Sequence, residues 1–358
     1  MALSKIKSSS MADTAIHGRR NIIINGAMQV AQRGTSASSV TASQYLCDRW
    51  EYETIGEETV TISQTTDVPS GFSNSFKVEI TTADSDVIAS DYAVVKQVIE
   101  AQNLQHLKYG SSDAETITLS FYVKSSVTGT YSVGLEHGET ASYYSQTYSI
   151  SSANTWEKKT VTLTGNTATA INNDNGAGLH VNFALSAGTS YTTGSNGVWG
   201  TATNWFANHA VNVIGTANAT FFITGVQLEV GEQATPFEHR SYGEELALCQ
   251  RYYHRISRGS GASSPVSVGF HTGTQHRGLV HFTTAMRSSP TVDKSSLSDI
   301  NVYHGGGIVT PTAISNEGVS DASITAVRFA ANSTGASNGD ATIIQLSADS
   351  FIDFDSEL

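Results

Sequence analysis

Short apolar runs that alternate with turn residues recur along the first two thirds of this chain. Within residues 116–123, Ile117, Leu119 and Phe121 alternate with polar residues. Successive side chains of a β-strand point to opposite faces, so this period of two predicts a strand with one face in the core. Many such runs separated by turn residues predict an all-β antiparallel sandwich. The predicted strands are 21–24, 59–62, 76–80, 92–98, 116–123, 130–135, 159–163, 179–185 and 221–230.

The pattern changes near residue 240, which predicts a second domain. Residues 234–243 read as a boundary, and residues 244–253 have helical spacing, with Glu244 and Glu245 in the first turn, where acidic side chains favour the helix dipole. Strand-like runs then return and predict a smaller all-β domain. These later runs are 265–270, 278–282, 300–303, 323–329 and 341–346. We therefore expect an anchoring peptide (1–17), a β-sandwich (18–240), a connecting helix (241–258) and a distal β domain (259–358).

The first 17 residues are polar and rich in serine. Four apolar residues are too few to build a core, so this segment is either a disordered terminus or a peptide that docks on a partner chain. We favour docking, with the apolar residues as anchors. They are Leu3, Ile6, Met11 and Ile16.

Charge and composition exclude several classes of partner. The chain has 358 residues, with 20 Lys and Arg against 32 Asp and Glu, a formal charge of −12. A nucleic-acid binder needs a basic patch, so we expect no nucleic-acid partner. No run of 18 apolar residues occurs, so we expect no membrane insertion. Cys47 and Cys249 form no CxxC pair, which favours two buried thiols over a disulfide.

The common catalytic and cofactor motifs are missing. The sequence has no nucleophile elbow, P-loop, HExxH or dinucleotide fingerprint, and we predict no cofactor and no catalytic residue. His271, His276 and His281 are five residues apart, a spacing that would divide them between the two faces of a strand, so surface or interface positions are favoured over a metal site. Two acidic runs lack the pattern of a calcium loop, and a structural calcium stays open there. They contain Asp84, Asp86 and Asp91, and Asn172, Asp174 and Asn175.

Two groups of carboxylates deserve comparison with glycoside hydrolases, whose two acids can come from distant points in the sequence. A solvated acidic face explains both groups more simply, and we expect no enzyme activity. The groups are Glu136 with Glu139, and Glu51, Glu53, Glu57 and Glu58 near Trp50.

Two expected loops, 136–148 and 186–210, are long, poor in charge and aromatic. The apolar face of a sugar ring packs on Trp or Tyr, while amides and hydroxyls meet its hydroxyl groups. The same rings can instead fill the core or a subunit contact, and both interpretations remain open. The candidate sugar-binding residues are Tyr143, Tyr144, Tyr148, Trp199 and Trp205.

Several strings, in order, resemble bacteriophage fibre or tail-fibre-like virion proteins with a carbohydrate-binding-module-like jelly roll. They are RNIIINGAMQVAQRG (20–34), DRW (48–50), TLSFYVKS (118–125), FITGVQLEVG (222–231), ATPFE (234–238) and EELALCQRYY (244–253). The resemblance implies a jelly-roll sandwich, a homotrimer and a place on the virion surface. It supplies no catalytic or sugar-contacting residues. A jelly roll that closes on itself would pair the strand from Asn21 with the strand from Phe221.

The leading hypothesis is a non-enzymatic phage fibre protein, assembled in the host cytoplasm. Its N-terminus would bind other virion structural proteins, and its distal domain or sandwich loops would contact a host surface glycan. For the three-fold contact we expect Leu246, Cys249 and Tyr253 of the helix, with packing on the chain's own sandwich as the equal alternative. The rival hypothesis is a decoration or adaptor protein of capsid or tail that binds no receptor.

Overall fold

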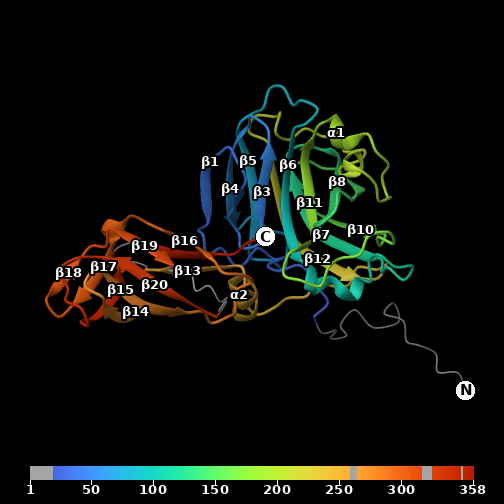
Figure 1. The fold of residues 1–358 in the computed structure, drawn as a ribbon. Helices are drawn as coiled ribbons and strands as arrows, with labels where there is room; N and C mark the ends of the chain where they lie inside the picture. The colour runs from blue at the N-terminus through green and yellow to red at the C-terminus, as the bar shows by residue number, and fades with distance from the viewer. Residues whose placement is uncertain (1–18, 259–263, 317–324, 348–349) are drawn as a thin grey trace, which may run out of the picture. The chain divides into compact units, whose positions relative to one another are not determined.

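The computed structural model describes residues 19–258, 264–316, 325–347 and 350–358, and it is nearly all β (Figure 1). The chain divides into two compact units. The N-terminal unit runs to Glu245 and includes Leu358, and the C-terminal unit spans Leu246–Glu357. Within the described residues, no helix is both long enough and apolar enough to span a bilayer.

The N-terminal unit consists of two six-stranded antiparallel sheets, which confirms the predicted all-β sandwich (Figure 1). Sheet A has the order β1 (Ser36–Val40), β4 (Thr59–Thr65), β5 (Ser75–Thr82), β12 (Thr220–Val230), β7 (Ile117–Ser125) and β10 (Glu157–Leu163). Sheet B has the order β2 (Gln44–Tyr45), β3 (Glu51–Ile55), β6 (Tyr92–Glu100), β11 (Ala177–Ala187), β8 (Gly129–His137) and β9 (Tyr143–Ile150). A 3-10 helix, η2 (Ala101–Leu107), follows β6.

The core lies between the two sheets. Ile117, Leu119 and Phe121 of β7 are fully buried, as the period of two predicted. Phe121 packs edge-on against Phe183 of β11 in the opposite sheet, with ring centroids 5.0 Å apart. Burying an aliphatic or aromatic side chain of this size contributes roughly 1.5–3 kcal/mol, so this cluster supplies the main driving force for folding.

The predicted first strand, 21–24, is not a strand. The segment does lie beside β12, since the Ile22 amide donates to the Leu228 carbonyl at 2.9 Å. The next bond comes from a side chain, because the Leu228 amide donates to Oδ1 of Asn21 at 3.0 Å. A side chain that takes the place of a backbone carbonyl interrupts the ladder, so the part of β12 that extends beyond its pairing with β5 is covered without a further strand.

Two expected loops contain regular structure. The segment 136–148 holds the end of β8 and most of β9, which pair antiparallel from Gly129 and Ile150 to Glu136 and Tyr143. The segment 186–210 holds α1 (Thr189–Thr192) and η3 (Ala202–Asn204). The loop prediction for 136–148 was wrong because aromatic side chains occupy both faces of β9 and hide its alternation.

The connecting helix is shorter than predicted. Helix α2 spans Tyr242–Gln250, and β13 (Tyr253–Ser257) follows where the helix was expected to continue to residue 258. Strand β13 pairs antiparallel with β22 (Phe351–Asp355), and Arg255 forms a two-pronged ion pair with Asp353. These long-range contacts stabilise the strand against the local helical pattern.

The C-terminal unit contains two antiparallel sheets. Sheet C has the order β13, β22 and β16 (Thr291–Lys294). Sheet D has the order β18 (Gly307–Val309), β17 (Ile300–His304), β21 (Ala341–Leu346), β14 (Ser264–His271), β15 (Gln275–His281), β20 (Ala326–Asn332) and β19 (Ala313–Asn316), and η4 (Leu297–Asp299) precedes β17. The described core of the C-terminal unit is small and is centred on Val280, Phe282, Ile344 and Phe354.

A row of apolar side chains crosses the outer face of sheet D. The register places Ile308 opposite Tyr303, Tyr303 opposite Ile343, Ile343 opposite Val268, and Val268 opposite Leu279. Val268 is 66% exposed, and Ile308 and Leu279 are each more than half exposed. We call these five residues the apolar row.

The helix residues predicted to form the three-fold contact are largely buried within the chain. Cys249 and Tyr253 are 0% and 2% exposed, and Leu246 is half-buried. Buried side chains present no surface to a partner, so the structure favours the alternative of packing within the chain. Both cysteines are buried and neither forms a disulfide, as predicted. The proposed anchors Leu3, Ile6, Met11 and Ile16 lie outside the described residues.

Candidate functional site

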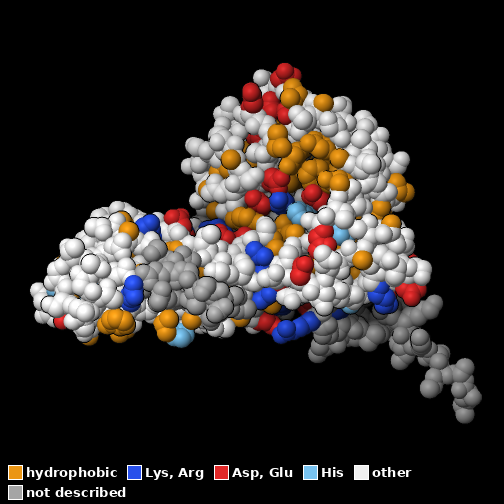
Figure 2. Space-filling view, viewed as in Figure 1, with side chains coloured by type: hydrophobic (Ala, Val, Ile, Leu, Met, Phe, Trp, Pro, Cys, Tyr) orange, Lys and Arg blue, Asp and Glu red, His pale blue; other side chains and the backbone are white. Residues whose placement is uncertain are grey.

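The outer face of sheet B gathers ionisable side chains from four neighbouring strands. Figure 2 shows acidic, basic and histidine side chains together on this face, beside a group of hydrophobic ones. The strand register sets the neighbours. Glu51 lies opposite Lys96, Lys96 opposite Asn182, and His180 opposite Glu136.

Lys96 links the carboxylates of β3. Its ammonium lies 3.2 Å from Glu51 and also contacts Glu53, and the side chains of Lys96 and Glu51 are each 13% exposed. Burial raises the pKa of Glu51 despite Lys96. For Glu53, the effect of burial is outweighed by Lys96 and by the Tyr92 hydroxyl, which lower the pKa. Burial opposes the charge of Lys96, but the two carboxylates raise its pKa overall. The cluster therefore holds an ionised Glu53 beside a charged lysine.

Glu136 and His180 form a neighbouring pair with their charges suppressed. Oε2 of Glu136 lies 3.5 Å from Nδ1 of His180. Burial, assisted by Glu53, raises the pKa of Glu136 to about 7, while burial and Lys96 lower the pKa of His180 to about 4. Between these values the carboxyl keeps its proton and the imidazole is neutral. Between about pH 4 and pH 7 this part of the face therefore presents an uncharged donor and acceptor.

An aromatic cluster adjoins these charges. The chain after β11 folds back over sheet B, so that Trp205 and Phe206 pack against Tyr92, Val94 and Ala184. The ring centroid of Trp205 is 5.0 Å from that of Tyr92 and 5.5 Å from those of Tyr143 and Tyr191. We call Tyr92, Tyr143, Tyr191 and Trp205 the aromatic cluster; Tyr143 and Tyr191 are its half-buried members.

Gly134 of β8 allows the aromatic chain segment to lie this close. A Cβ atom at Gly134 would be 2.4 Å from the Trp205 carbonyl oxygen and 2.7 Å from the Phe206 ring. Atoms at these separations overlap, so any larger residue would push the segment away from sheet B.

Several buried polar atoms on this face have no hydrogen-bond partner within the described chain. They include Oδ1 of Asn182 and Nε1 of Trp205. Buried polar groups in folded proteins are nearly always paired with protein or water. Both atoms are buried, since Asn182 and Trp205 are 0% and 7% exposed, so they are unsatisfied within the described chain and are not part of the exposed surface.

The structure separates the five predicted sugar-binding residues. Tyr143 and Trp205 belong to the aromatic cluster on the outer face. Tyr144 and Tyr148 point into the core, where they are 2% and 7% exposed, because β9 alternates and the two are four residues apart. Trp199 packs on Tyr144 and donates to the Thr164 carbonyl at 2.8 Å. These last three residues serve packing, the alternative that the sequence left open.

The predicted carboxylate groups divide in the same way. Glu51, Glu53 and Glu136 meet on the outer face of sheet B. Glu57 and Glu139 are exposed, while Glu58 is buried and accepts from the Tyr52 hydroxyl. Glu51 and Glu53 alternate with the buried Tyr52, which is a sequence signal for a shared outward face. His180 and Asn182 likewise alternate with the buried Leu179, Val181 and Phe183. Only the register of distant strands, however, brings them and Lys96 beside the carboxylates.

The metal candidates are used in other ways. Among the described residues, no group of three His, Cys, Asp or Glu side chains is arranged to hold a metal ion. Asp84 accepts from the Asp86 amide at 2.9 Å, and Asp174 from the Gly176 amide at 2.8 Å. These carboxylates stabilise turns.

The histidine prediction was wrong in part. His271 and His276 lie opposite each other on β14 and β15 and are fully buried, while His281 is exposed. His271 contacts the Ser333 hydroxyl at 3.1 Å, and His276 contacts the Thr342 hydroxyl at 2.6 Å. These hydroxyl partners, one following β20 and one on β21, satisfy the rings and allow their burial.

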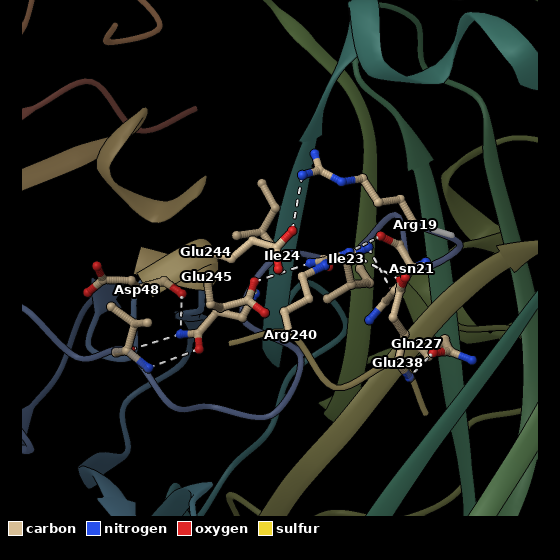
Figure 3. Close-up of polar contacts among 12 residues, drawn as sticks. Arg19, Asn21, Ile23, Ile24, Asp48, Gln227, Glu238, Arg240, Glu244 and Glu245 are labelled. Carbon is tan, nitrogen blue, oxygen red and sulfur yellow. Dashed lines mark hydrogen bonds and ion pairs between the residues drawn. The ribbon is translucent and has the colours of Figure 1, made fainter. Parts of the chain in front are cut away.

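Five of the six strings that carry the family resemblance, all but 118–125, meet in one polar network beside β12 (Figure 3). Oε2 of Glu238 accepts from the backbone amides of Arg20 and Asn21 at 3.0 and 2.8 Å. The Glu238 amide donates to Oε1 of Gln227 at 2.7 Å. The segment expected to be a domain boundary is therefore fixed to the sandwich.

The same network reaches the first turn of α2. Arg240 donates to the carbonyls of Ile23 and Asn21 and lies 3.2 Å from Glu245 (Figure 3). Oε1 of Glu245 accepts from the Asn25 amide at 2.6 Å. We call the contacts of Arg240 and Glu245 with Asn21, Ile23 and Asn25 the terminal clamp. Its role is structural, since the carboxylates and the guanidinium satisfy backbone groups of an irregular segment.

No family model matches the chain, and no curated protein is similar to it in sequence. Similar solved structures include the enzymatically active domain of tailspike protein 4 of bacteriophage CBA120, 15% identical over 59% of this chain and 21% of that chain, with a TM-score of 0.34. A CBM4 structure is 15% identical over 58% of this chain and 98% of its own, with a TM-score of 0.29. The family 11 carbohydrate-binding module of a Clostridium thermocellum cellulase is 13% identical over 55% and 99%, with a TM-score of 0.27. The match spans about a fifth of the tailspike chain. Carbohydrate-binding modules and a phage tailspike domain are thus among the structural neighbours of this protein.

Proposed function

We propose that the outer face of sheet B binds a host surface glycan. The observation that carries the proposal is the aromatic cluster beside the Glu51–Lys96–Glu53 group and the neutral Glu136–His180 pair. Aromatic rings take the apolar face of a sugar, and neighbouring carboxylates, amides and imidazoles bind its hydroxyl groups. Tyr143 and Tyr191 are half-buried, so their rings are available at the rim of the cluster.

Titration of the purified protein with host surface polysaccharide tests this proposal. We expect Tyr143→Ala to weaken binding about tenfold, because one stacked ring contributes on the order of 1 kcal/mol or more. Tyr242→Ala is the matched control, since Tyr242 is 57% exposed and lies outside this face. Equal binding by the wild type and Tyr143→Ala would remove sheet B from the proposal.

The site is proposed to bind without catalysis. A raised and a lowered carboxyl pKa side by side occur in glycoside hydrolases, and Glu136 and Glu53 have these properties. However, Glu53 is engaged by Lys96 and Tyr92, which leaves it poorly placed as a nucleophile. Release of reducing sugar from host polysaccharide by the wild type, and its loss in Glu136→Gln, would contradict this view.

We further propose that the protein is a bacteriophage fibre component that attaches to other virion proteins through residues 1–17. The purified protein should then block adsorption of phage to host cells. Unchanged adsorption would favour a decoration or adaptor protein without a receptor. Labelled protein should be located on intact virions, and deletion of residues 1–17 should abolish its incorporation.

A homotrimer would suit this role, because three copies multiply weak sugar contacts through effective concentration. For the contact between copies we propose the apolar row of sheet D in place of the buried helix residues. Large exposed apolar surfaces mark interaction sites. Light scattering should give three times the mass of one chain for the wild type. For Val268→Lys it should give the mass of a single chain. A monomeric wild type would rule out the trimer.

A further inference from the structure

A pocket opens on sheet A, on the side of the sandwich opposite to the charged face. Its volume is about 440 Å³, within the range of roughly 300–1,000 Å³ that is typical of small-molecule sites. The floor is formed by Ser120 and Tyr122 of β7 and by Gly225 of β12. The walls are formed by residues 70–72, by Lys158 of β10 and by residues 234–237 with His239.

The pocket depends on an irregularity in β12. The register between β12 and β7 shifts between Thr224 and Gln227, and Gly225 adopts a φ of +61°. A Cβ atom at Gly225 would lie 2.6 Å from Cζ of Phe72 and 3.0 Å from Tyr122. The bulge thus lets two aromatic rings approach the backbone of β12.

The far wall is held in place by buried polar side chains. Oε1 of Glu229 accepts from the Thr235 amide at 2.8 Å, and Gln227 accepts from the Glu238 amide at 2.7 Å. Gln227 and Glu229 are 0% and 3% exposed. The wall is therefore positioned before any ligand arrives, which reduces the entropy cost of binding.

The rings lining the pocket come from three separate parts of the chain. The centroid of Phe72 lies 5.3 Å from that of Tyr122, 5.1 Å from that of Phe237 and 5.4 Å from that of His239. Ser70, Ser120 and Thr235 add hydroxyl groups to the lining. Ring faces and edges with hydroxyls between them match a ligand ring that is apolar on its faces and polar at its rim.

Lys158 supplies the charge. Lys77, Lys96, Lys108, Lys124 and Lys159 each contact a carboxylate. Lys158 is exposed, and its ammonium makes no ion pair within the described residues. No acidic side chain lines the pocket. An unpaired cation in an aromatic pocket favours an anionic group on the ligand.

We propose that this pocket binds an acidic sugar, whose ring packs among Phe72, Tyr122 and Phe237 and whose carboxylate pairs with Lys158. This site is separate from the proposed face on sheet B and does not rest on it. Tyr143→Ala should leave binding in the pocket unchanged, so the two proposals fail independently.

Calorimetric titration with methyl β-D-glucuronide tests the pocket, with methyl β-D-glucoside as the neutral counterpart. We expect saturable binding of the glucuronide, a preference over the glucoside of about fivefold, and loss of that preference at high ionic strength. Lys158→Met should remove the preference, and Phe237→Ala should weaken binding of both sugars.

Lys108→Met is the matched control, because it changes the net charge equally at an exposed lysine outside the pocket. It should keep the preference. The proposal is overturned if the wild type does not bind the glucuronide, if it binds both sugars equally, or if Lys158→Met keeps the preference. Circular dichroism of each variant separates these outcomes from misfolding.

Discussion

The outer faces of sheets A and B arise from the same strand alternation but treat their charges differently. On sheet B, Lys96 is largely buried and paired with two carboxylates, and the aromatic rings lie beside this group. On sheet A, Lys158 is exposed at the rim of an aromatic pocket and makes no ion pair with another described residue. A paired charge contributes to folding, whereas an unpaired one remains available to a ligand. The same residue type is therefore part of an ion-pair group on one face and, in our proposal, of a ligand site on the other.

The largest expected effect is that of Lys96→Met, which we compare with Lys158→Met. Lys96→Met leaves Glu51 and Glu53 largely buried without their cation, and we expect a loss of about 3 kcal/mol in the free energy of unfolding. Lys158→Met should change it by less than about 0.5 kcal/mol. Urea unfolding of both variants measures the contrast. Similar losses in the two would mean that Lys158 is a structural residue.

The next effect is a pH dependence on the face of sheet B. The pKa of Glu136 is about 7 in the folded protein and 4.5 ordinarily, so folding takes up a proton between these values and stability falls as pH rises. Glu136→Gln removes this dependence. From pH 5 to 7, the free energy of unfolding of the variant should rise relative to that of the wild type by up to about 1.4 kcal/mol per pH unit.

His180 acts in the opposite direction. Its pKa is about 4 in the folded protein, against an ordinary 6.5, so stability falls as pH drops through this interval. The free energy of unfolding of His180→Gln should therefore rise relative to that of the wild type as pH falls from 6.5 to 4. Unfolding measured across this range, with both single variants, separates the two groups. A difference between each variant and the wild type that does not vary with pH would contradict the assigned pKa directions.

A smaller effect distinguishes two glycines. Gly134→Ala places a methyl group against Trp205 and Phe206, and we expect a loss of about 1–3 kcal/mol together with a change in tryptophan fluorescence. Gly225→Ala strains a left-handed backbone position and crowds Phe72, and we expect a loss of about 1–2 kcal/mol. Only Gly225→Ala should impair glucuronide binding, and impairment by Gly134→Ala would show that the two faces are coupled.

Much of the sandwich could be predicted from local pattern. Residues 116–123 alternate cleanly, and their apolar members are fully buried in β7. Strand β9 was not predicted, because Tyr143 and Tyr144 place rings on both faces and the alternation of apolar and polar residues is lost. Strand β13 escaped as well, since its pairing with β22 joins residues about a hundred positions apart.

The candidate sites were harder to predict for the same reason. Glu51, Lys96 and His180 come from three strands, and only the register makes them neighbours. The pocket on sheet A needs the bulge at Gly225 and the return of residues 234–237 to the sheet, and neither follows from spacing. Tyr143 and Trp205 were found because aromatic content alone pointed to them.

The terminal clamp has a mechanical consequence for the N-terminal unit. Tension that enters at Arg19 and leaves at Glu245 meets the Asn25–Glu245 and Arg240–Ile23 bonds first, because these join the two ends of the unit directly. Of the strands, β12 is also bonded to this segment through Asn21 and Ile22 and shares the load. A pull along the chain would therefore be borne by a few short polar bonds, and the layered core would stay folded until they part.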